Sequence, residues 1–407
     1  MMVKFILLSL ICLLPCLVKA QVTAPIDTTN VDVDTTGQKD LIDVGRSLLN
    51  IKTERTYKRE KKDFYFELLP FTSHVPGGGK ALVTSTTANF YLGDRKTTYL
   101  STITFAPYFN LSGRYGLPIH TVIWLRDNAY VIVGNTHFLV YPQDTWGLGG
   151  GQPDANKILI NYSYVRFYQS VLKRIKPYFY AGLGVNLDYY INVRTESAQS
   201  ISDFTNYPYG TAQNSNPIST GLSAALLYDT RQNFYNPIPG GYINLVYRHN
   251  AGFMGSNDNA QSIYVDLRKY ISLTSGGPQK NLLAFWTYYW TTLTAGTPYL
   301  ALPAIGMDPN NRSGRGIEQN RYRGEGLVYF ETEYRRDITR NGLIGFVLFA
   351  NVNSASQPNT HKFVYWNPAA GTGIRLKFNK KSGQNICFDY GVSKGYSDFI
   401  LSIDEAF

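Results

Sequence analysis

Charged residues make up only 17% of the 407-residue chain, and cysteine appears only three times. So few cysteines exclude a small scaffold built on disulfides. The several apolar runs of about 20 residues that a helical membrane bundle needs are also missing. Aromatic residues, in contrast, reach 14% with 32 Tyr, which excludes a disordered chain.

The first apolar run predicts a cleaved secretory signal peptide over Met1–Ala20. Lys4 supplies the positive start, Phe5–Val18 the apolar stretch and Ala20 the small residue before cleavage. A membrane anchor helix is the alternative, which the shortness of the run disfavours. Cleavage leaves Cys387 alone, so we expect an exported chain without an internal disulfide.

Residues 21–62 are expected to form a periplasmic N-terminal tail. Lys39–Ile51 places apolar residues such as Val44 and Leu48 at helical spacing, which predicts a short amphipathic helix. This helix can plug a lumen, lie on the inner leaflet, dock a partner or remain a lightly held tail. The basic stretch Lys52–Lys62 can meet anionic lipid headgroups or a periplasmic partner, or can be a solvated linker.

A two-residue alternation runs through 178–194 and predicts a strand far longer than is usual in soluble proteins. The apolar positions are Phe179, Ala181, Leu183, Val185, Leu187, Tyr189, Ile191 and Val193. The alternate positions are Tyr180, Gly182, Gly184, Asn186, Asp188, Tyr190, Asn192 and Arg194. An apolar face with aromatics and a polar face are typical of strands between lipid and a wet lumen.

The same alternation recurs in about sixteen segments, joined by short turns at one end and often long loops at the other. The predicted fold is all-β: a transmembrane antiparallel β-barrel over residues 63–407, preceded by the short helix or tail. Closure of the barrel would remove sheet edges that cannot be satisfied in lipid. A large secreted β-sandwich or propeller is the alternative, but shorter strands would be typical of it.

Several motifs resemble the BamA/TamA superfamily of outer-membrane assembly barrels. Tyr228–Arg231 with Asn233, Asn236, Pro237 and Gly240 is similar to its strand–turn–strand motif, in which Asp229 and Arg231 are the charged positions. Arg315, Gly316 and Ile317, with Arg321–Arg323 downstream, resemble the tip of its long sixth loop. Further similar segments are Val265–Tyr270, Glu333–Arg335, Gly371–Arg375 and Asp389–Gly391. The resemblance covers most of residues 63–407.

The resemblance implies sixteen strands, a weak seam between the first and last strands, and a sixth loop that folds into the lumen. In the family, an inward Asp pairs with the loop arginine; that position is Asn351 here, and a neutral amide cannot form a charged bidentate pair with Arg315. Strand parity directs Glu331 and Glu333 inward, so they are alternative partners. A solvated Arg315 is the simpler alternative. Residues 21–62 are too few for the client-capturing repeat domains of the family.

The end of the sequence also resembles the family. Phe399, Leu401, Ile403 and Phe407 share one face by alternation, as in the recognition strand that barrel-assembly machinery reads, although Glu405 interrupts the apolar pattern. A strand that merely ends in Phe is the alternative.

No enzyme motif was found. The five His are scattered without metal-ligand spacing, and Gly77–Lys80 lacks the spacing of a phosphate-binding loop. We therefore expect no catalytic residues, metal or cofactor, and no nucleic-acid partner.

The expected location is the bacterial outer membrane, with the lipid bilayer as a partner. The expected function is outer-membrane protein assembly or translocation, or an accessory role in a biogenesis complex, with client barrels, surface lipoproteins or complex subunits as partners. The alternatives are a passive pore or structural barrel and, further off, a lipid-modifying enzyme.

Overall fold

The computed structural model describes residues 37–50, 64–74, 80–109, 113–196, 200–231, 236–237, 239–274, 280–380 and 383–407, with the side chains of 64–74 and 80–85 left aside. The expected signal peptide and the basic stretch Lys52–Lys62 lie outside these residues. The helices are α2 (Leu41–Leu48) and α3 (Ile201–Thr205), and neither is both long and apolar enough to cross a membrane. Short 3-10 turns lie at η1 (Arg126–Asn128), η2 (Asp154–Asn156), η3 (Gly252–Met254) and η4 (Tyr299–Ala301).

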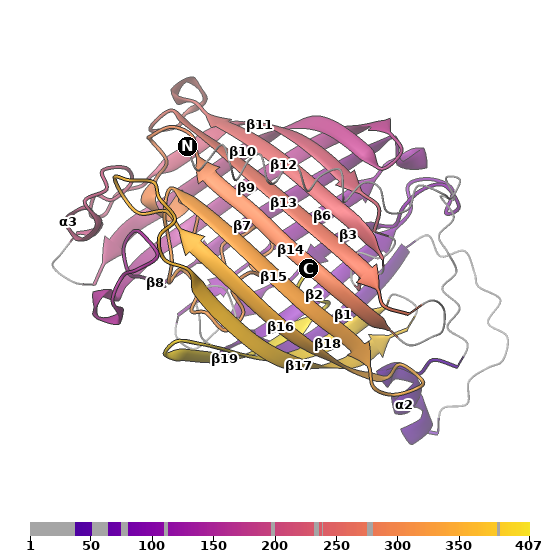
Figure 1. Ribbon diagram of the computed structural model, residues 1–407. Helices are drawn as coiled ribbons and strands as arrows, with labels where there is room; N and C mark the ends of the chain where they lie inside the picture. The colour runs from indigo at the N-terminus through magenta and orange to yellow at the C-terminus, as the bar shows by residue number, and fades with distance from the viewer. Residues whose placement is uncertain are drawn as a thin grey trace.

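The described residues form one antiparallel sheet of nineteen strand segments, curled into a barrel (Figure 1). The strands are β1 (Phe64–His74), β2 (Lys80–Phe90), β3 (Ser101–Phe105), β4 (Tyr108–Phe109), β5 (Tyr115–Gly116), β6 (Ile119–Trp124), β7 (Tyr130–Val140), β8 (Gln143–Thr145), β9 (Ile158–Lys176), β10 (Phe179–Thr195), β11 (Ile218–Asp229), β12 (Gly240–Asn250), β13 (Ala260–Ser272), β14 (Asn281–Thr292), β15 (Gly326–Asp337), β16 (Ile344–Ala355), β17 (Asn367–Asn379), β18 (Gln384–Ser393) and β19 (Tyr396–Ile403).

The segments amount to sixteen barrel strands. β3 and β4 both pair with β2 and continue one another, as do β5 and β6 beside β7. β8 is a three-residue strand in the loop before β9 and pairs only with the start of β9. The remaining strands pair in chain order through β19. The predicted fold class and strand number are therefore confirmed.

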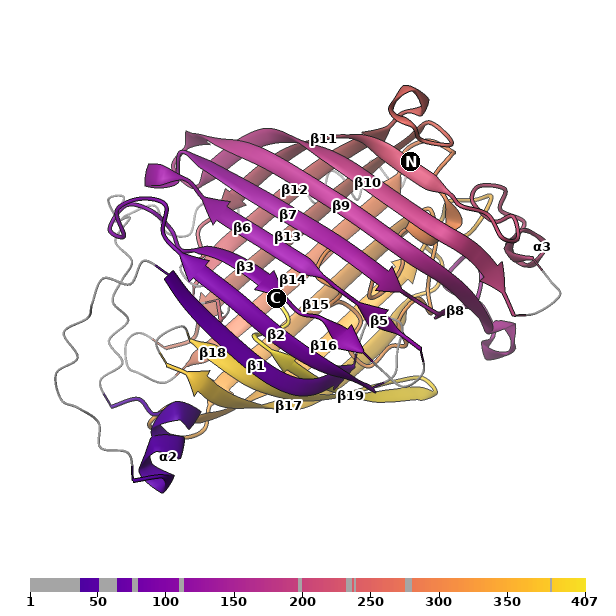
Figure 2. The ribbon, with the colours of Figure 1, turned by 180° about the vertical axis from the view of Figure 1, so that it is seen from behind.

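The sheet is not closed by backbone pairing. β1 and β19 lie beside each other (Figure 2), yet no residue pairs join them among the described residues. The expectation that closure removes every edge is thus wrong at this point. Within the part of the chain that the structure describes, the facing edges of β1 and β19 are not joined by a ladder.

The faces of the strands follow the predicted alternation. On β10, Leu183 is 71% exposed on the outside, while Asp188 is 1% exposed on the inside. Three clusters of buried apolar and aromatic side chains fill the interior, and two of them include loop residues as well as inward strand residues. An apolar outer surface with a polar and aromatic interior is the arrangement expected of a barrel in lipid.

The alternation fails at the end of β10. Asn192 adopts φ +56°, and the register with β9 shifts between Ile191 and Arg194. This β-bulge turns Val193 inward, where it is fully buried, and leaves Arg194 exposed. The predicted outward Val193 and inward Arg194 are therefore wrong.

Candidate functional site

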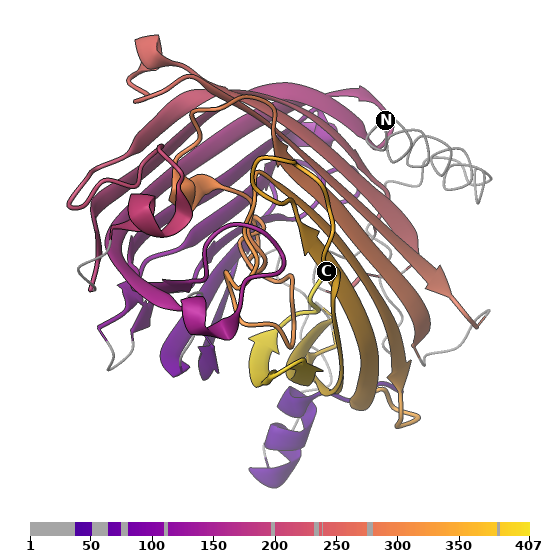
Figure 3. The ribbon, with the colours of Figure 1, turned by 60° about the vertical axis from the view of Figure 1, so that its left-hand side comes forward.

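The loop between β14 and β15, residues 293–325, folds back into the barrel (Figure 3). Its Arg315 reaches Asp389 on the barrel wall. Gly314 and Gly316 both adopt φ +80°, a conformation that other residues rarely reach. A Cβ on Gly314 would lie 2.5 Å from Ile305, and one on Gly316 would lie 2.8 Å from the backbone of Gly391 on β18. The two glycines therefore let the loop tip turn tightly and touch the barrel backbone.

Ile317 anchors the tip on its apolar side. It is 8% exposed and belongs to a cluster with Trp286, Tyr329 and Ile305. Its N–H donates to the Gly314 carbonyl at 2.8 Å, which closes the turn. The turn and the packing of Ile317 together fix the direction in which Arg315 leaves the loop.

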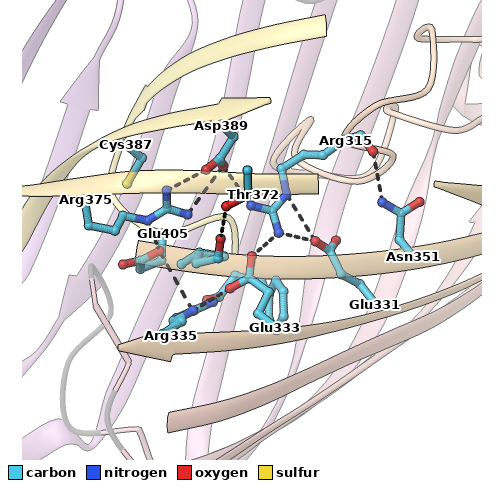
Figure 4. Close-up of polar contacts among 12 residues, drawn as sticks. Arg315, Glu331, Glu333, Arg335, Asn351, Thr372, Arg375, Cys387, Asp389 and Glu405 are labelled. Carbon is cyan, nitrogen blue, oxygen red and sulfur yellow. Dashed lines mark hydrogen bonds and ion pairs between the residues drawn. The ribbon is translucent and has the colours of Figure 1, made fainter. Parts of the chain in front are cut away.

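The guanidinium of Arg315 meets three carboxylates (Figure 4). Nε donates to Oε1 of Glu331 at 3.1 Å, and Nη1 donates to Oδ2 of Asp389 at 2.8 Å. Nη2 pairs with both Glu331 and Glu333. With Arg315 only 4% exposed, these are buried charge-assisted bonds.

Asn351 bonds the loop through its amide. Its Nδ2 donates to the backbone carbonyl of Arg315 at 3.0 Å. The neutral side chain therefore holds the loop backbone and leaves the guanidinium to the carboxylates. Asp389 on β18 supplies the third carboxylate. The alternation of the sequence predicts that Asp389 faces inward, but it does not predict that this residue lies beside the loop tip.

The charges continue toward the turn side of the barrel. Arg375 Nη1 donates to Asp389 at 2.5 Å and its Nε to Glu405 at 2.8 Å. Arg335 Nε donates to Glu333 at 2.5 Å. We call this set the lumen cluster: Arg315, Glu331, Glu333, Arg335, Arg375, Asp389 and Glu405. Charges alternate through it, which offsets the desolvation of each group.

Glu405 lies beyond the last strand. Burial acts to raise the pKa of its carboxyl, but Arg375 and Arg335 outweigh burial and hold that pKa below its ordinary value. Asn385 Nδ2 adds a hydrogen bond of 3.0 Å. Glu405 is therefore held in its ionised form, and it joins the end of the chain to the lumen cluster.

The last residues leave the face expected for a recognition strand. Phe399, Leu401 and Ile403 pair with outward residues of β18, and Phe399 is 70% exposed. Asp404 then adopts φ +68°, and Phe407 turns into the lumen, where it is 3% exposed. The expectation that Phe407 shares the outward face is wrong, because the strand ends at Ile403 and a turn comes directly after it.

The ring of Phe407 packs inside the barrel. It lies 5.2 Å from the Trp286 ring and 6.2 Å from that of Tyr270, measured between centroids. Arg335 covers the ring at 5.0 Å and donates to the Phe407 carbonyl at 2.9 Å. The terminal segment therefore occupies the turn-side half of the lumen.

The strand–turn motif shapes the turn between β11 and β12. Asp229 accepts bonds from Arg231 Nε at 2.9 Å and Nη2 at 2.8 Å. Asn236 and Pro237 are buried, and Asn236 Nδ2 donates to the Gly383 carbonyl at 3.1 Å. A Cβ on Gly240 would approach the Thr230 carbonyl at 2.9 Å. The motif thus brings this turn to the distant turn between β17 and β18.

The loop end of the lumen is filled by side chains. Tyr141, Tyr207 and Tyr299 from three loops join inward tyrosines of β9 and β10 in one buried cluster. Arg323 is fully buried and its Nη1 donates to the Tyr299 carbonyl at 2.8 Å. Arg321 Nη2 reaches Asp154 at 2.8 Å. The downstream basic segment of the long loop therefore fastens it to the loop before β9.

Two histidines that look scattered in the sequence meet inside the barrel. The rings of His120 and His137 lie edge to face with centroids 5.4 Å apart. Among the described residues, no three His, Cys, Asp or Glu side chains converge as metal ligands would.

These features define a class: a transmembrane β-barrel whose lumen holds a returning loop and whose first and last strands, among the described residues, are not joined to each other by a ladder. The chain matched no model of a protein family, and it matched no curated protein. Solved structures do match its fold. BamA from Haemophilus ducreyi lacking POTRA domains 1–3 aligns over 84% of this chain and 69% of its own, at 14% identity and a TM-score of 0.53.

Two CdiB barrels match equally well. CdiB from Acinetobacter baumannii has a TM-score of 0.55 and CdiB from Escherichia coli one of 0.54, each at 10% identity over 84% of this chain. The aligned part spans 60% and 62% of those chains, so activities of the whole CdiB proteins do not transfer directly. At these identities the likeness shows the fold. The resemblance inferred from the motifs is confirmed at that level, as is the outer-membrane type of barrel, which agrees with the predicted location.

Proposed function

We propose that this protein assists the assembly or translocation of outer-membrane proteins, as a membrane-embedded accessory subunit of a biogenesis complex. The observation that supports this most is the absence of ladder pairs between β1 and β19 in an otherwise continuous described sheet. Backbone N–H and C=O groups left unpaired in lipid cost several kcal/mol each. A client strand that forms a ladder at this seam gains backbone hydrogen bonds there, and these supply the driving force for strand addition.

Because side chains occupy the lumen, we place client binding at the seam between β1 and β19. The lumen cluster, Phe407 and the tyrosines of the loops occupy the interior at both ends. A client therefore meets this barrel at the wall and not through its centre.

The passive pore gains no support from the same observations. A barrel with its loop fastened by Arg315 and Arg323 should be electrically silent in planar bilayers. Steady, large conductance would favour the pore. It would also contradict the argument that the occupied lumen directs clients to the seam.

A photocrosslinker at the seam tests the proposal. Benzoylphenylalanine replaces Phe399, which lies outward on β19 and is 70% exposed. The matched control is Phe285 on β14, outward and 42% exposed but far from the seam. We expect adducts with newly made barrels or surface lipoproteins from position 399 and far fewer from 285. Equal adducts at both positions, or unchanged outer-membrane composition after depletion of the protein, would contradict the proposal.

A further inference from the structure

The helix α2 is well formed although it has only eight residues. Asp40 caps it: the Asp43 N–H donates to Asp40 Oδ1 at 2.7 Å, and the Asp40 N–H donates to Asp43 Oδ2 at 3.4 Å. This reciprocal pair is a capping box and satisfies two of the free donors at the helix start. The helix therefore has a defined first turn and a defined orientation.

The first turn fastens the helix to the barrel. The Lys380 N–H donates to Asp40 Oδ2 at 3.0 Å, and Lys380 Nζ contacts Asp43 Oδ2 at 2.5 Å. Just before the helix, the Lys39 N–H donates to the Asn341 carbonyl at 3.0 Å. Burial acts to raise the pKa of Asp43, but Lys380 outweighs it and the pKa lies below its ordinary value. The attachment is polar, and it uses the turns after β15 and β17.

The apolar side of the helix is exposed at its C-terminal end. Leu41, Val44 and Leu48 recur at spacings of three and four and so share one face, on the opposite side from Asp43. Leu48 is 79% exposed and Leu49, at the C-cap, is 72% exposed. No residue of α2 is buried. An amphipathic helix held by its polar edge thus presents Leu48 and Leu49 outward, whereas Leu41 and Val44 are half-buried.

The position of α2 indicates what covers these leucines. Figures 1 and 2 both show α2 at the turn-side rim, extending sideways past the end of β17 and away from the barrel axis. It does not enter the lumen, so the expected alternative of a plug is excluded for the described helix. Beside it, the outward Ile374, Leu376 and Phe378 of β17 belong to the lipid-facing surface of the barrel. The helix therefore lies at the edge of the bilayer.

We propose that α2 is an interfacial anchor whose leucines insert into the periplasmic leaflet, next to anionic headgroups. Arg46 is exposed in its last turn. Directly C-terminal to the helix segment, residues 52–62 of the sequence hold six basic and two acidic side chains. In the sequence, these apolar residues are followed by an excess of positive charge, a composition that suits an anionic lipid surface. Because α2 lies next to the lipid-facing surface of β17, lipid is favoured over a protein partner as the cover of its exposed leucines.

A fluorescent probe on the full-length barrel in nanodiscs tests this inference. An environment-sensitive dye is attached to Leu48→Cys, with Ser47→Cys as the matched control on the neighbouring exposed position of the polar face. Cys387 is fully buried, so native labelling is directed to the new cysteine. We expect a blue shift at position 48, quenching by lipids that carry a nitroxide near the headgroup, and a weaker response at 47. The response should be larger in phosphatidylglycerol than in phosphatidylcholine.

Three results would overturn the anchor. Equal quenching at 47 and 48 would show that the leucine face has no preference for lipid. No quenching in either lipid would show that the helix stays in water. Shielding of position 48 in native outer membranes but not in lipid-only nanodiscs would show that a protein covers the helix. Retained heat-modifiable gel migration of each variant confirms that the barrel is folded, and because the probe needs no client, the outcome is independent of the assembly proposal.

Discussion

Gly316 in the returning loop and Gly391 on β18 touch backbone to backbone: a Cβ on Gly391 would lie 2.6 Å from the Gly316 nitrogen. Only a glycine at each position permits this approach, since real Cβ contacts are essentially never so short. The contact places the Arg315 backbone against the barrel and so brings its guanidinium to the carboxylates.

We therefore predict that Gly391→Ala displaces the loop tip. Overpacking of this kind costs about 1–3 kcal/mol. Limited proteolysis of the detergent-solubilised barrel should cut residues 293–325 faster than in the parent. Gly241→Ala on β12 is the control, because its nearest atom would lie 3.7 Å away and the backbone is not strained. Similar cleavage of all three proteins would show that the close approach does not hold the loop.

Arg315→Ala should loosen the loop further. The substitution leaves Glu331, Glu333 and Asp389 buried without their shared cation, which typically costs about 3–5 kcal/mol. We expect faster proteolysis of the loop and a lower urea midpoint, with heat-modifiable migration retained. Arg340→Ala, an exposed turn arginine, should change neither quantity. An Arg315→Ala loop as resistant as the parent would show that Arg315 does not lock it.

The stability of the terminal segment should depend on pH through Glu405. Its pKa is lower in the folded protein than its ordinary value of 4.5, so the folded state favours the ionised carboxylate. Its contribution is therefore complete above about pH 5 and is lost as the pH falls through the folded pKa. Urea unfolding of the parent and of Glu405→Gln at a series of pH values should differ most at neutral pH, and the difference should shrink in acid. A constant difference would contradict the assignment.

Much of this architecture is predictable because alternation is a local signal. A two-residue period identifies a strand and its inward face, and inward parity correctly indicated Glu331 and Glu333 as residues near the Arg315 guanidinium. Parity also directed Asp389 inward. Its contact with Arg315 could not be predicted, because it depends on how far the loop returns and on which strand it meets. The position of α2 outside the lumen likewise depends on Lys380, distant in sequence.

The two errors of inside–outside parity arise where one residue leaves the regular backbone. Asn192 and Asp404 both adopt positive φ, and each reverses the parity of the residues after it. Asn and Asp tolerate this conformation, but many Asn and Asp residues do not adopt it, so the sequence alone could not locate the bulge or the end of β19.

The bulge at Asn192 predicts an inversion of accessibility. A membrane-impermeant maleimide should react with Arg194→Cys and not with Val193→Cys, because Val193 is fully buried against inward tyrosines while Arg194 is exposed. Cys387 is buried and should not react in the folded barrel. Uninterrupted alternation would give the opposite order, with Val193→Cys outside the barrel and Arg194→Cys within the filled lumen.

The inward turn after β19 makes a final prediction about two phenylalanines. Phe407→Ala removes a ring packed on Trp286 and covered by Arg335, so it should lower the free energy of unfolding by about 3–5 kcal/mol. Phe399→Ala should lower the free energy of unfolding much less, since that ring is 70% exposed on the lipid side. Its nearest ring partner is Tyr390, with the two ring centroids 4.5 Å apart. Urea unfolding followed by tryptophan fluorescence measures both, and Trp286 itself reports the loss of its neighbour. Equal destabilisation, or a larger effect of Phe399→Ala, would indicate that the last residue lies on the outer face with β19, as the alternation alone implied.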